Sequence, residues 1–337
     1  VVSASATTSG EIWTCTVVIS DVLSSIILQD SVTIVGGCAD PFDTNCDSIV
    51  DGRILATGSV TSCAINTGGQ IECWGDNSSN QLTTIPQGAQ VSLSFSGQHG
   101  CALDAAGNVA CWGLNNHGQS NPPSLTFEQI ATGAYHTCGL DSSGGVHCWG
   151  AGQSSGNWPE YGQSNPPAGT FTQISADYYH TCGVQTNGTI ACWGITNGDV
   201  SRDYGQVTDT PMTGGFVQVD TGLSHNCALD TVGMTTCWGR NEAGQSTPPI
   251  TSFVQVSSGW MHSCGLQSTG SVQCWGIIDN GNYDFGQVTD TPSATFVQIS
   301  IGSYNSCGID DTGMVHCWGW DIWGQSTPPN GFVAYPF

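Results

Sequence analysis

The sequence predicts an all-β protein, a seven-bladed β-propeller with a short N-terminal β-strand extension. Two observations support this fold class. A unit of about 40 residues recurs seven times, and each unit holds two cysteines ten positions apart followed by Trp-Gly. No long window shows the period of an amphipathic helix. A unit of this length has room for three or four short strands, so seven units fit one small antiparallel sheet per blade.

Five units open on a short β-favouring segment of the form Phe-x-Gln-[Ile/Val], such as residues 127–130 and 253–256. Gly, Asn and Pro bound these segments, as expected for strands that end in turns. Next come G-x-x-H-x-C, then C-W-G, then Gly-Gln and a proline. The spacing between units varies, which indicates a constant core with loop insertions.

The two cysteines of a unit lie at equal distances from a glycine-centred turn, so they should face each other across a hairpin. Adjacent antiparallel strands bring Cα atoms within disulfide range. With 17 cysteines, the chain is expected in an oxidising compartment, secreted or at the cell surface. The predicted bridges are Cys63–Cys73, Cys101–Cys111, Cys138–Cys148, Cys182–Cys192, Cys227–Cys237, Cys264–Cys274 and Cys307–Cys317.

Five histidines occupy one position of the unit, two residues before its first cysteine. Thr61 and Asn305 hold this position in the first and last units. Ring symmetry places one such residue in each blade, too far apart to ligate a single metal ion. We therefore expect a structural, hydrogen-bonding role for His99, His136, His180, His225 and His262.

The charge of the chain limits the classes of molecule that it is expected to bind. Three arginines and no lysine stand against 26 acidic residues, for a net charge of −23. This balance repels phosphate, so nucleic acid and anionic membranes are not expected as partners. No run of about 20 apolar residues predicts a membrane span. Residues 1–10 lack an apolar signal region, which suggests an already processed chain. Solubility alone explains the acidity; the alternatives are cation binding or a basic partner.

The motifs G-x-x-H-x-C, C-W-G and G-Q-x-x-x-P resemble the regulator of chromosome condensation repeat family, over about Gly52 to Phe337. The likeness looks closest to the bacterial secreted branch that includes the β-lactamase inhibitory propeller. That branch implies a seven-bladed ring used for protein binding. The nuclear branch implies nucleotide exchange and chromatin contact. This chain departs from it in its cysteines and its lack of basic residues, so we do not carry that activity over.

The first unit lacks the opening Phe and Gln, whereas the chain ends on a further opening strand at residues 332–337. We expect this C-terminal strand to complete the first blade and close a propeller domain of residues 51–337. The alternative is a frayed tail.

Residues 1–50 fit no blade. Residues 11–20 and 26–35 look like two strands, which cannot form a stable domain alone. They must pack on their own propeller or on a neighbouring molecule, as in strand exchange. Cys38 and Cys46 are the expected local disulfide. The candidate self-assembly residues are Ile12, Trp13, Cys15, Val17 and Ile19.

A candidate Ca²⁺ loop lies just before the propeller and is similar to the calcium loop of dockerin modules. Its predicted ligands are the side chains of Asp43, Asn45, Asp47 and Asp51 and the carbonyl of Ile49. Ser48 replaces the usual turn glycine, and Ile54 replaces the usual bidentate acid. The alternative is an Asp/Asn-rich linker. We expect no other cofactor.

Aromatic residues flank the histidine position, and more follow C-W-G in the loops, including Trp158, Tyr161, Tyr283, Phe285 and Trp320. Loops at one end of the blades share a face, where aromatic side chains act as rigid contact anchors for a protein or sugar. The alternative is local loop packing. The predicted binding-face residues are Tyr135, Tyr178, Tyr179, Trp260 and Tyr304.

No catalytic motif such as G-x-S-x-G or H-E-x-x-H occurs, so we expect no enzyme. The preferred function is a secreted structural or adhesive protein whose propellers self-assemble, fibre-like, through the N-terminal segment. The alternative is a monomeric secreted propeller that binds a protein or glycan, as an inhibitor does. A lyase or glycosidase would need an acid/base pair that the sequence does not reveal.

Overall fold

The computed structural model describes residues 13–17, 30–34, 53–88, 90, 92–154, 158–199, 201–279 and 281–334. The chain divides into two compact units, Val1–Asp51 and Gly52–Phe337. The described residues form 23 strands and no helix. The predicted Ca²⁺ loop, the Cys38–Cys46 pair, Ile12 and Ile19 lie outside the described residues.

In the compact unit Val1–Asp51, β1 (Trp13–Val17) pairs with β2 (Asp30–Ile34) in an antiparallel two-stranded sheet. Thr14 pairs with Thr33 and Thr16 with Ser31. This sheet is the short N-terminal β-strand extension that the sequence predicts.

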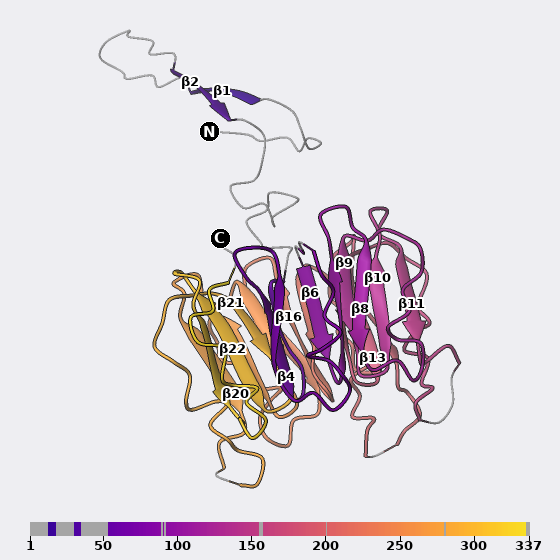
Figure 1. The fold of residues 1–337 in the computed structure, drawn as a ribbon. Coiled ribbons are helices and arrows are strands. Elements are labelled where there is room, and N and C mark those ends of the chain that lie inside the picture. The colour runs from indigo at the N-terminus through magenta and orange to yellow at the C-terminus, as the bar shows by residue number, and fades with distance from the viewer. Residues whose placement is uncertain are drawn as a thin grey trace. The chain divides into compact units, whose positions relative to one another are not determined.

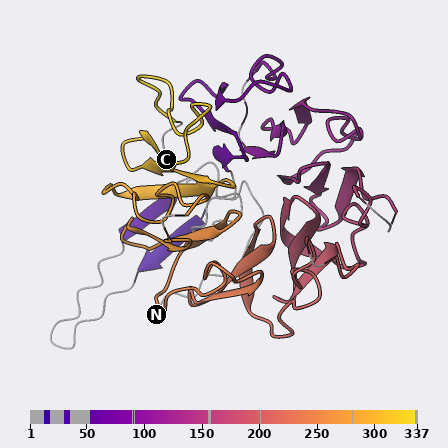
Figure 2. The same cartoon turned by 90° about the horizontal axis from the view of Figure 1, so that it is seen from below.

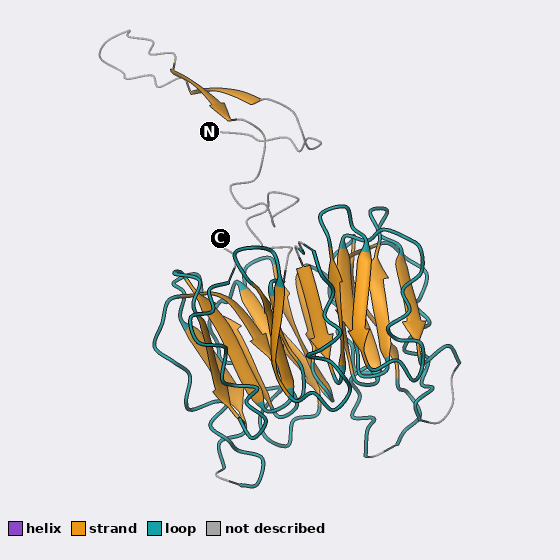
Figure 3. Cartoon of the chain, viewed as in Figure 1, coloured by secondary structure: helices purple, strands orange, loops and turns teal. Residues whose placement is uncertain are grey.

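The second unit is the predicted seven-bladed propeller, with seven antiparallel sheets of three strands each arranged around an axis (Figures 1–3). We number the blades in chain order. They consist of β3 (Leu55–Thr57), β4 (Thr61–Ile65) and β5 (Ile71–Gly75); β6 (Ser92–Ser96), β7 (His99–Leu103) and β8 (Val109–Gly113); β9 (Gln129–Thr132), β10 (His136–Leu140) and β11 (Val146–Gly150); β12 (Phe171–Asp177), β13 (His180–Gln185) and β14 (Ile190–Gly194); β15 (Phe216–Thr221), β16 (His225–Asp230) and β17 (Thr235–Gly239); β18 (Gln255–Ser258), β19 (His262–Leu266) and β20 (Val272–Gly276); and β21 (Phe296–Ile301), β22 (Asn305–Asp310) and β23 (Val315–Gly319).

Each blade places its first strand at the central channel and its third strand outermost. The channel is lined by residues of all seven first strands, many of them hydroxyl-bearing, such as Ser94, Thr132 and Ser175. The hydrophobic core lies between neighbouring blades. Trp238 of blade 5, for example, packs with Cys182 and Val184 of blade 4. Each blade therefore buries its apolar surface against the next one.

The seven hairpin disulfides predicted from the sequence are present. In each blade the two cysteines are directly opposed on the second and third strands, as with Cys138 and Cys148. The Cα atoms of the seven pairs lie 4.0–4.1 Å apart.

The five histidines join neighbouring blades, in agreement with the structural role expected for them. The imidazole Nε2 of His136 lies 2.7 Å from Thr181 Oγ1 in the next blade, and His225 contacts Ser263 at the same distance. His99, His180 and His262 make equivalent contacts. Asn305 links blade 7 to blade 1 by donating to Ser62 Oγ at 3.2 Å, whereas Thr61 of blade 1 donates to the nearby Asp76 carbonyl. Burial lowers the pKa of His136 to about 3, so the ring is neutral.

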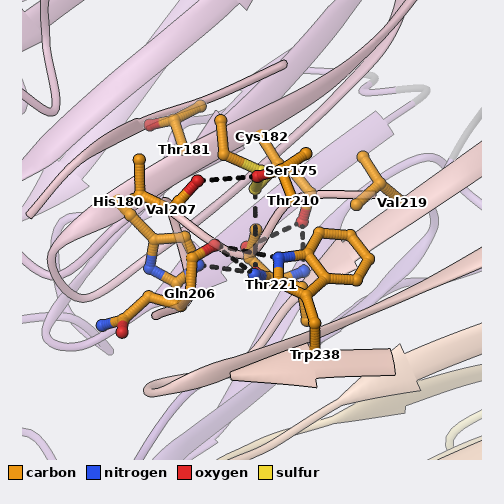
Figure 4. Close-up of a disulfide and its surroundings, with 12 residues drawn as sticks. Ser175, His180, Thr181, Cys182, Gln206, Val207, Thr210, Val219, Thr221 and Trp238 are labelled. Carbon is orange, nitrogen blue, oxygen red and sulfur yellow. Dashed lines mark hydrogen bonds between the residues drawn. A yellow bond between two sulfur atoms is a disulfide. The ribbon is translucent and has the colours of Figure 1, made fainter. Parts of the chain in front are cut away.

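The seven repeated tryptophans make a second set of links between blades. Each indole N–H donates to the backbone carbonyl of a glutamine in the preceding loop, as Trp238 does to Gln206 at 3.0 Å. Figure 4 shows Trp238, Gln206 and His180 converging beside the disulfide of Cys182. In blade 1 the partner is Gln325 from the last loop, at 2.9 Å from Trp74.

The C-terminal segment contacts the last blade and the first blade of the ring. Ala334 donates its N–H to Gly313 O of blade 7 at 2.8 Å and pairs with Asn66 of blade 1. Phe216, which opens blade 5, makes the same two contacts with Gly188 and Asp230. Ala334 therefore takes the backbone position of an opening phenylalanine. The Phe332 ring lies 6.0 Å from Trp74. Residues 335–337 lie outside the described part of the chain.

Candidate binding face

One end of the ring carries two loops from each blade, and we call it the hairpin end. At this end the first strand of each blade turns into the second, and the third strand ends in the loop that follows C-W-G. The turns that join the second and third strands, which hold the Asp-x-x-Gly segments such as residues 230–233, lie at the opposite end. Strand order and antiparallel pairing place both loops at this end in every blade. It is the lower end in Figure 1, where the longest loops extend from the sheets.

The first aromatic cluster at the hairpin end, the Tyr135 arc, comes from blades 2 to 4. Tyr135 lies 5.5 Å from His117, 5.7 Å from Trp158 and 6.3 Å from Tyr178, measured between ring centroids. The arc continues from Tyr178 to Tyr179 and Tyr161 at 5.2 and 5.4 Å. Most of these rings meet edge to face, the favourable geometry for aromatic pairs. The arc consists of His117, Tyr135, Trp158, Tyr161, Tyr178 and Tyr179.

The second cluster, the Trp260 arc, comes from blades 6 and 7. The Trp260 ring lies 5.0 Å from Tyr304 and 5.1 Å from Tyr283. Tyr304 in turn contacts Phe285 at 5.7 Å and Trp320 at 5.4 Å. Tyr283 is 48% exposed, similar to the 53% of Trp158 in the other arc. The arc consists of Trp260, Tyr283, Phe285, Tyr304 and Trp320.

The phenols of Tyr178 and Tyr304, one in each arc, stay protonated at neutral pH. Burial raises the pKa of Tyr178, and the neighbouring Tyr135 and Asp177 raise it further. Burial also raises the pKa of Tyr304 to about 12. Their hydroxyl groups therefore remain hydrogen-bond donors, so the arcs combine apolar ring surface with neutral polar groups.

The cations of the propeller are all in ion pairs. Arg53 bonds Asp220 at 2.8 Å, Arg202 bonds Asp199 at 2.8 Å, and Arg240 pairs with Glu242. Burial raises the pKa of Tyr179 and the nearby Arg202 guanidinium opposes this rise, so the Tyr135 arc has a cation beside it. The loops of the Trp260 arc contain no arginine.

The central channel contains two carboxyl groups. Asp177 accepts a hydrogen bond from Ser96 Oγ at 2.9 Å, and burial raises the pKa of Asp177 to about 7. Asp220 accepts from Arg53 on the far side of the ring and from the Ser258 N–H at 2.7 Å. These contacts tie blades across the channel. In the described part of the chain, no three His, Cys, Asp or Glu side chains cluster as a metal site would require.

The structure places the five predicted binding-face residues at the hairpin end but in two clusters. Tyr135, Tyr178 and Tyr179 belong to one arc, Trp260 and Tyr304 to the other. Sequence reasoning missed His117 and Arg202. Both lie in loops after C-W-G, and that position was the available signal. Of the predicted self-assembly residues, Trp13, Cys15 and Val17 lie in β1.

Four segments, residues 90–119, 127–157, 253–287 and 296–325, match the model of the regulator of chromosome condensation (RCC1) repeat. These four segments are therefore similar to the RCC1 repeat. The resemblance noted in the sequence is confirmed at this level, and the likeness to the bacterial secreted branch stays a prediction. The matched RCC1 segments include the loops that carry His117, Tyr283, Phe285 and Trp320.

Solved structures share the propeller fold. The ectodomain of the Physcomitrella patens receptor kinase CR4 is 24% identical, with a TM-score of 0.63 over 79% of this chain and 71% of that one. The CRINKLY WD40 ectodomain of the Arabidopsis thaliana receptor kinase ACR4 is 22% identical, with a TM-score of 0.62 over 80% and 97%. Prp20p from Saccharomyces cerevisiae is 17% identical, with a TM-score of 0.63 over 85% and 87%. Among curated protein sequences, none matches the chain.

Among the described residues, no helix is long and apolar enough to cross a membrane.

Proposed function

We propose that this chain is a secreted, non-enzymatic propeller that binds an extracellular protein or glycan through the aromatic arcs of its hairpin end. The observation behind the proposal is the pair of continuous arcs on loops that differ from blade to blade. Fixed sheets that carry variable loops are a common way to build a recognition surface. Tyrosine and tryptophan dominate the energetics of such surfaces because each buries a large, rigid ring.

Two further observations support an extracellular binding role. Disulfides persist in oxidising compartments, and this propeller has one in each of its seven blades. Proteins with the same fold include the two receptor-kinase ectodomains and Prp20p, for which binding to Gsp1p and histones is described.

The test compares the full chain with two variants in panels of immobilised glycans and extracellular proteins. Trp260→Ala removes the centre of one arc. Val232→Ser is the control, because Val232 is 71% exposed on a hairpin turn at the opposite end of the ring. We expect Trp260→Ala to weaken capture about tenfold or more, as loss of an interface anchor does, and Val232→Ser to leave it unchanged. Equal losses in both variants, or no ligand in either panel, would contradict the proposal.

A second candidate function is self-assembly into a fibre through the N-terminal segment. It is supported by the two-stranded sheet that β1 and β2 form in the described part of the chain, because such a sheet is marginally stable in water. Negative-stain electron microscopy of the chain with and without residues 1–50 tests this candidate. Filaments that disappear on truncation would support it, and isolated rings in both samples would exclude it. Adding a Ca²⁺ chelator to the sample that keeps residues 1–50 tests whether assembly depends on the Ca²⁺ loop predicted at residues 43–51.

A further inference from the structure

The Trp260 arc differs from the Tyr135 arc in charge, and this difference identifies a class of partner. We propose that the Trp260 arc binds an arginine- or lysine-rich protein segment. The proposal rests on the function proposed above and specifies the ligand chemistry of one of its two arcs.

The charge of the whole chain favours such a partner. The sequence has 26 acidic residues, three arginines and no lysine. Each arginine is already paired with a carboxylate of the chain, so the propeller offers an approaching molecule a predominantly negative surface. A field of this sign accelerates the association of cationic partners and disfavours anionic ones.

Exposed carboxylates lie on the same loops as the rings of the arc. Asp279 precedes Tyr283 by four residues, and Asp321 follows Trp320 directly. The carboxylate of Asp290 lies beside Gly286, where a Cβ would come within 2.1 Å of its oxygen. Asp279, Asp290 and Asp321 are exposed, and the hydrogen bonds they accept come from neighbouring loop groups, such as Gly281 N and Thr327 Oγ1.

The rings supply the second half of the recognition chemistry. A guanidinium or ammonium group is attracted to the face of tryptophan or tyrosine, and the attraction is strongest for tryptophan. A planar guanidinium also stacks on a ring while it donates to a carboxylate. Tyr283 is about half exposed and lies against Trp260, so a cation that docks there meets ring surface and carboxylates together.

The Tyr135 arc provides the internal comparison. Its rings are exposed to a similar degree at Trp158, but Arg202 lies beside Tyr179 and pairs with Asp199. Arg202 therefore already occupies a carboxylate beside this arc, whereas the loops of the Trp260 arc contain no arginine. We therefore expect a cationic segment to prefer the Trp260 arc.

The experiment measures fluorescence anisotropy of a labelled Arg-Gly repeat peptide with the full chain. A citrulline-Gly peptide of the same length keeps the shape of the side chains and removes their charge. The protein variants are Tyr283→Ala in the Trp260 arc and Trp158→Ala in the Tyr135 arc, which match in exposure. Circular dichroism verifies that both fold.

We expect the arginine peptide to bind at least about tenfold more tightly than the citrulline peptide, and this ratio to shrink as salt is raised. We expect Tyr283→Ala to weaken binding by about fivefold or more and Trp158→Ala to weaken it by less than about twofold. The control Val232→Ser, at the opposite end of the ring, should leave it unchanged. Equal affinity for both peptides, equal losses in both variants, or no binding would overturn the proposal. If the peptide fails while capture in the panels still depends on Trp260, binding by the face stands and only its cationic ligand is wrong.

Discussion

The chain uses tryptophan in two regions with opposite consequences. Seven tryptophans recur after the second cysteine of each unit, are buried between blades and donate to a glutamine carbonyl, as Trp238 does to Gln206. Trp158, Trp260 and Trp320 have no counterpart in most other units and lie in the arcs of the hairpin end. Repetition thus marks residues that hold the ring together, and departure from the repeat marks residues that remain available for contact.

The largest expected effect is on stability, and it is tested with one tryptophan substitution from each region. Trp238→Ala removes a buried indole between blades 4 and 5 and leaves a cavity, so we expect the free energy of unfolding to fall by about 3–5 kcal/mol. Trp158→Ala removes a ring that is 53% exposed, and we expect a loss below about 1 kcal/mol. Urea unfolding followed by circular dichroism measures both. Similar losses would remove the distinction between the two regions.

The disulfides should behave as part of the ring and leave the binding face unaffected. Replacing Cys227 and Cys237 together by alanine opens a short cross-link, which we expect to cost about 2–3 kcal/mol. The same urea experiment measures the loss, and peptide anisotropy measures binding at a temperature where the variant is folded. Unchanged stability, or lost peptide binding in the folded variant, would show that the hairpin disulfides do something other than stabilise blades.

The Asp177 carboxyl group in the channel should make the free energy of unfolding depend on pH. Burial raises the pKa of Asp177 to about 7, so the folded state holds this proton over a range in which the unfolded state has lost it. The free energy of unfolding should therefore decrease as the pH rises from about 4 to about 7. Because the side chain is only partly buried and still touches channel solvent, we expect a change of about 1–2 kcal/mol.

The Asp177→Asn variant should remove this dependence. Asp104→Asn is the control, because a hydrogen bond from Asn108 lowers the pKa of Asp104 and gives the opposite sign. Unfolding curves across this pH range would contradict the assignment if the wild-type protein and the Asp177→Asn variant kept the same slope.

The smallest effect on stability is expected from a substitution that tests the charge difference between the two arcs. Arg202→Gln breaks an exposed ion pair with Asp199, so we expect less than about 1 kcal/mol of destabilisation. It also frees a carboxylate beside the Tyr135 arc, which then resembles the Trp260 arc in charge. Calorimetric titration with the arginine peptide should show a gain of about two- to fivefold in overall affinity. No gain would mean that charge does not distinguish the arcs.

The repeated features of the fold were predictable because each recurs in five to seven units of the sequence. The strand order, the hairpin disulfides and the hydrogen-bonding role of residues such as His180 follow from one unit and its recurrence. The C-terminal contacts at Ala334 also had a signal, since the first unit lacks an opening phenylalanine.

The division of the binding face into two arcs was not predictable. Which aromatic rings meet depends on the path of loops whose lengths differ between units. His117 reaches Tyr135 from the loop of another blade, and no local pattern encodes that approach. The pairing of Arg202 with Asp199, and its position beside Tyr179, depend on the same loop paths. Position relative to C-W-G predicted that these loops share one end of the ring, and it predicted no contacts between them.

The most direct test of the central claim is hydrogen–deuterium exchange of the full chain with and without the arginine peptide. We expect slower exchange in residues 281–287, 303–304 and 320–323, which surround the Trp260 arc, and no change in hairpin turns at the opposite end, such as residues 230–234. Protection at the opposite turns, or uniform protection of all seven blades, would contradict a binding face made by the irregular aromatic residues of the hairpin end.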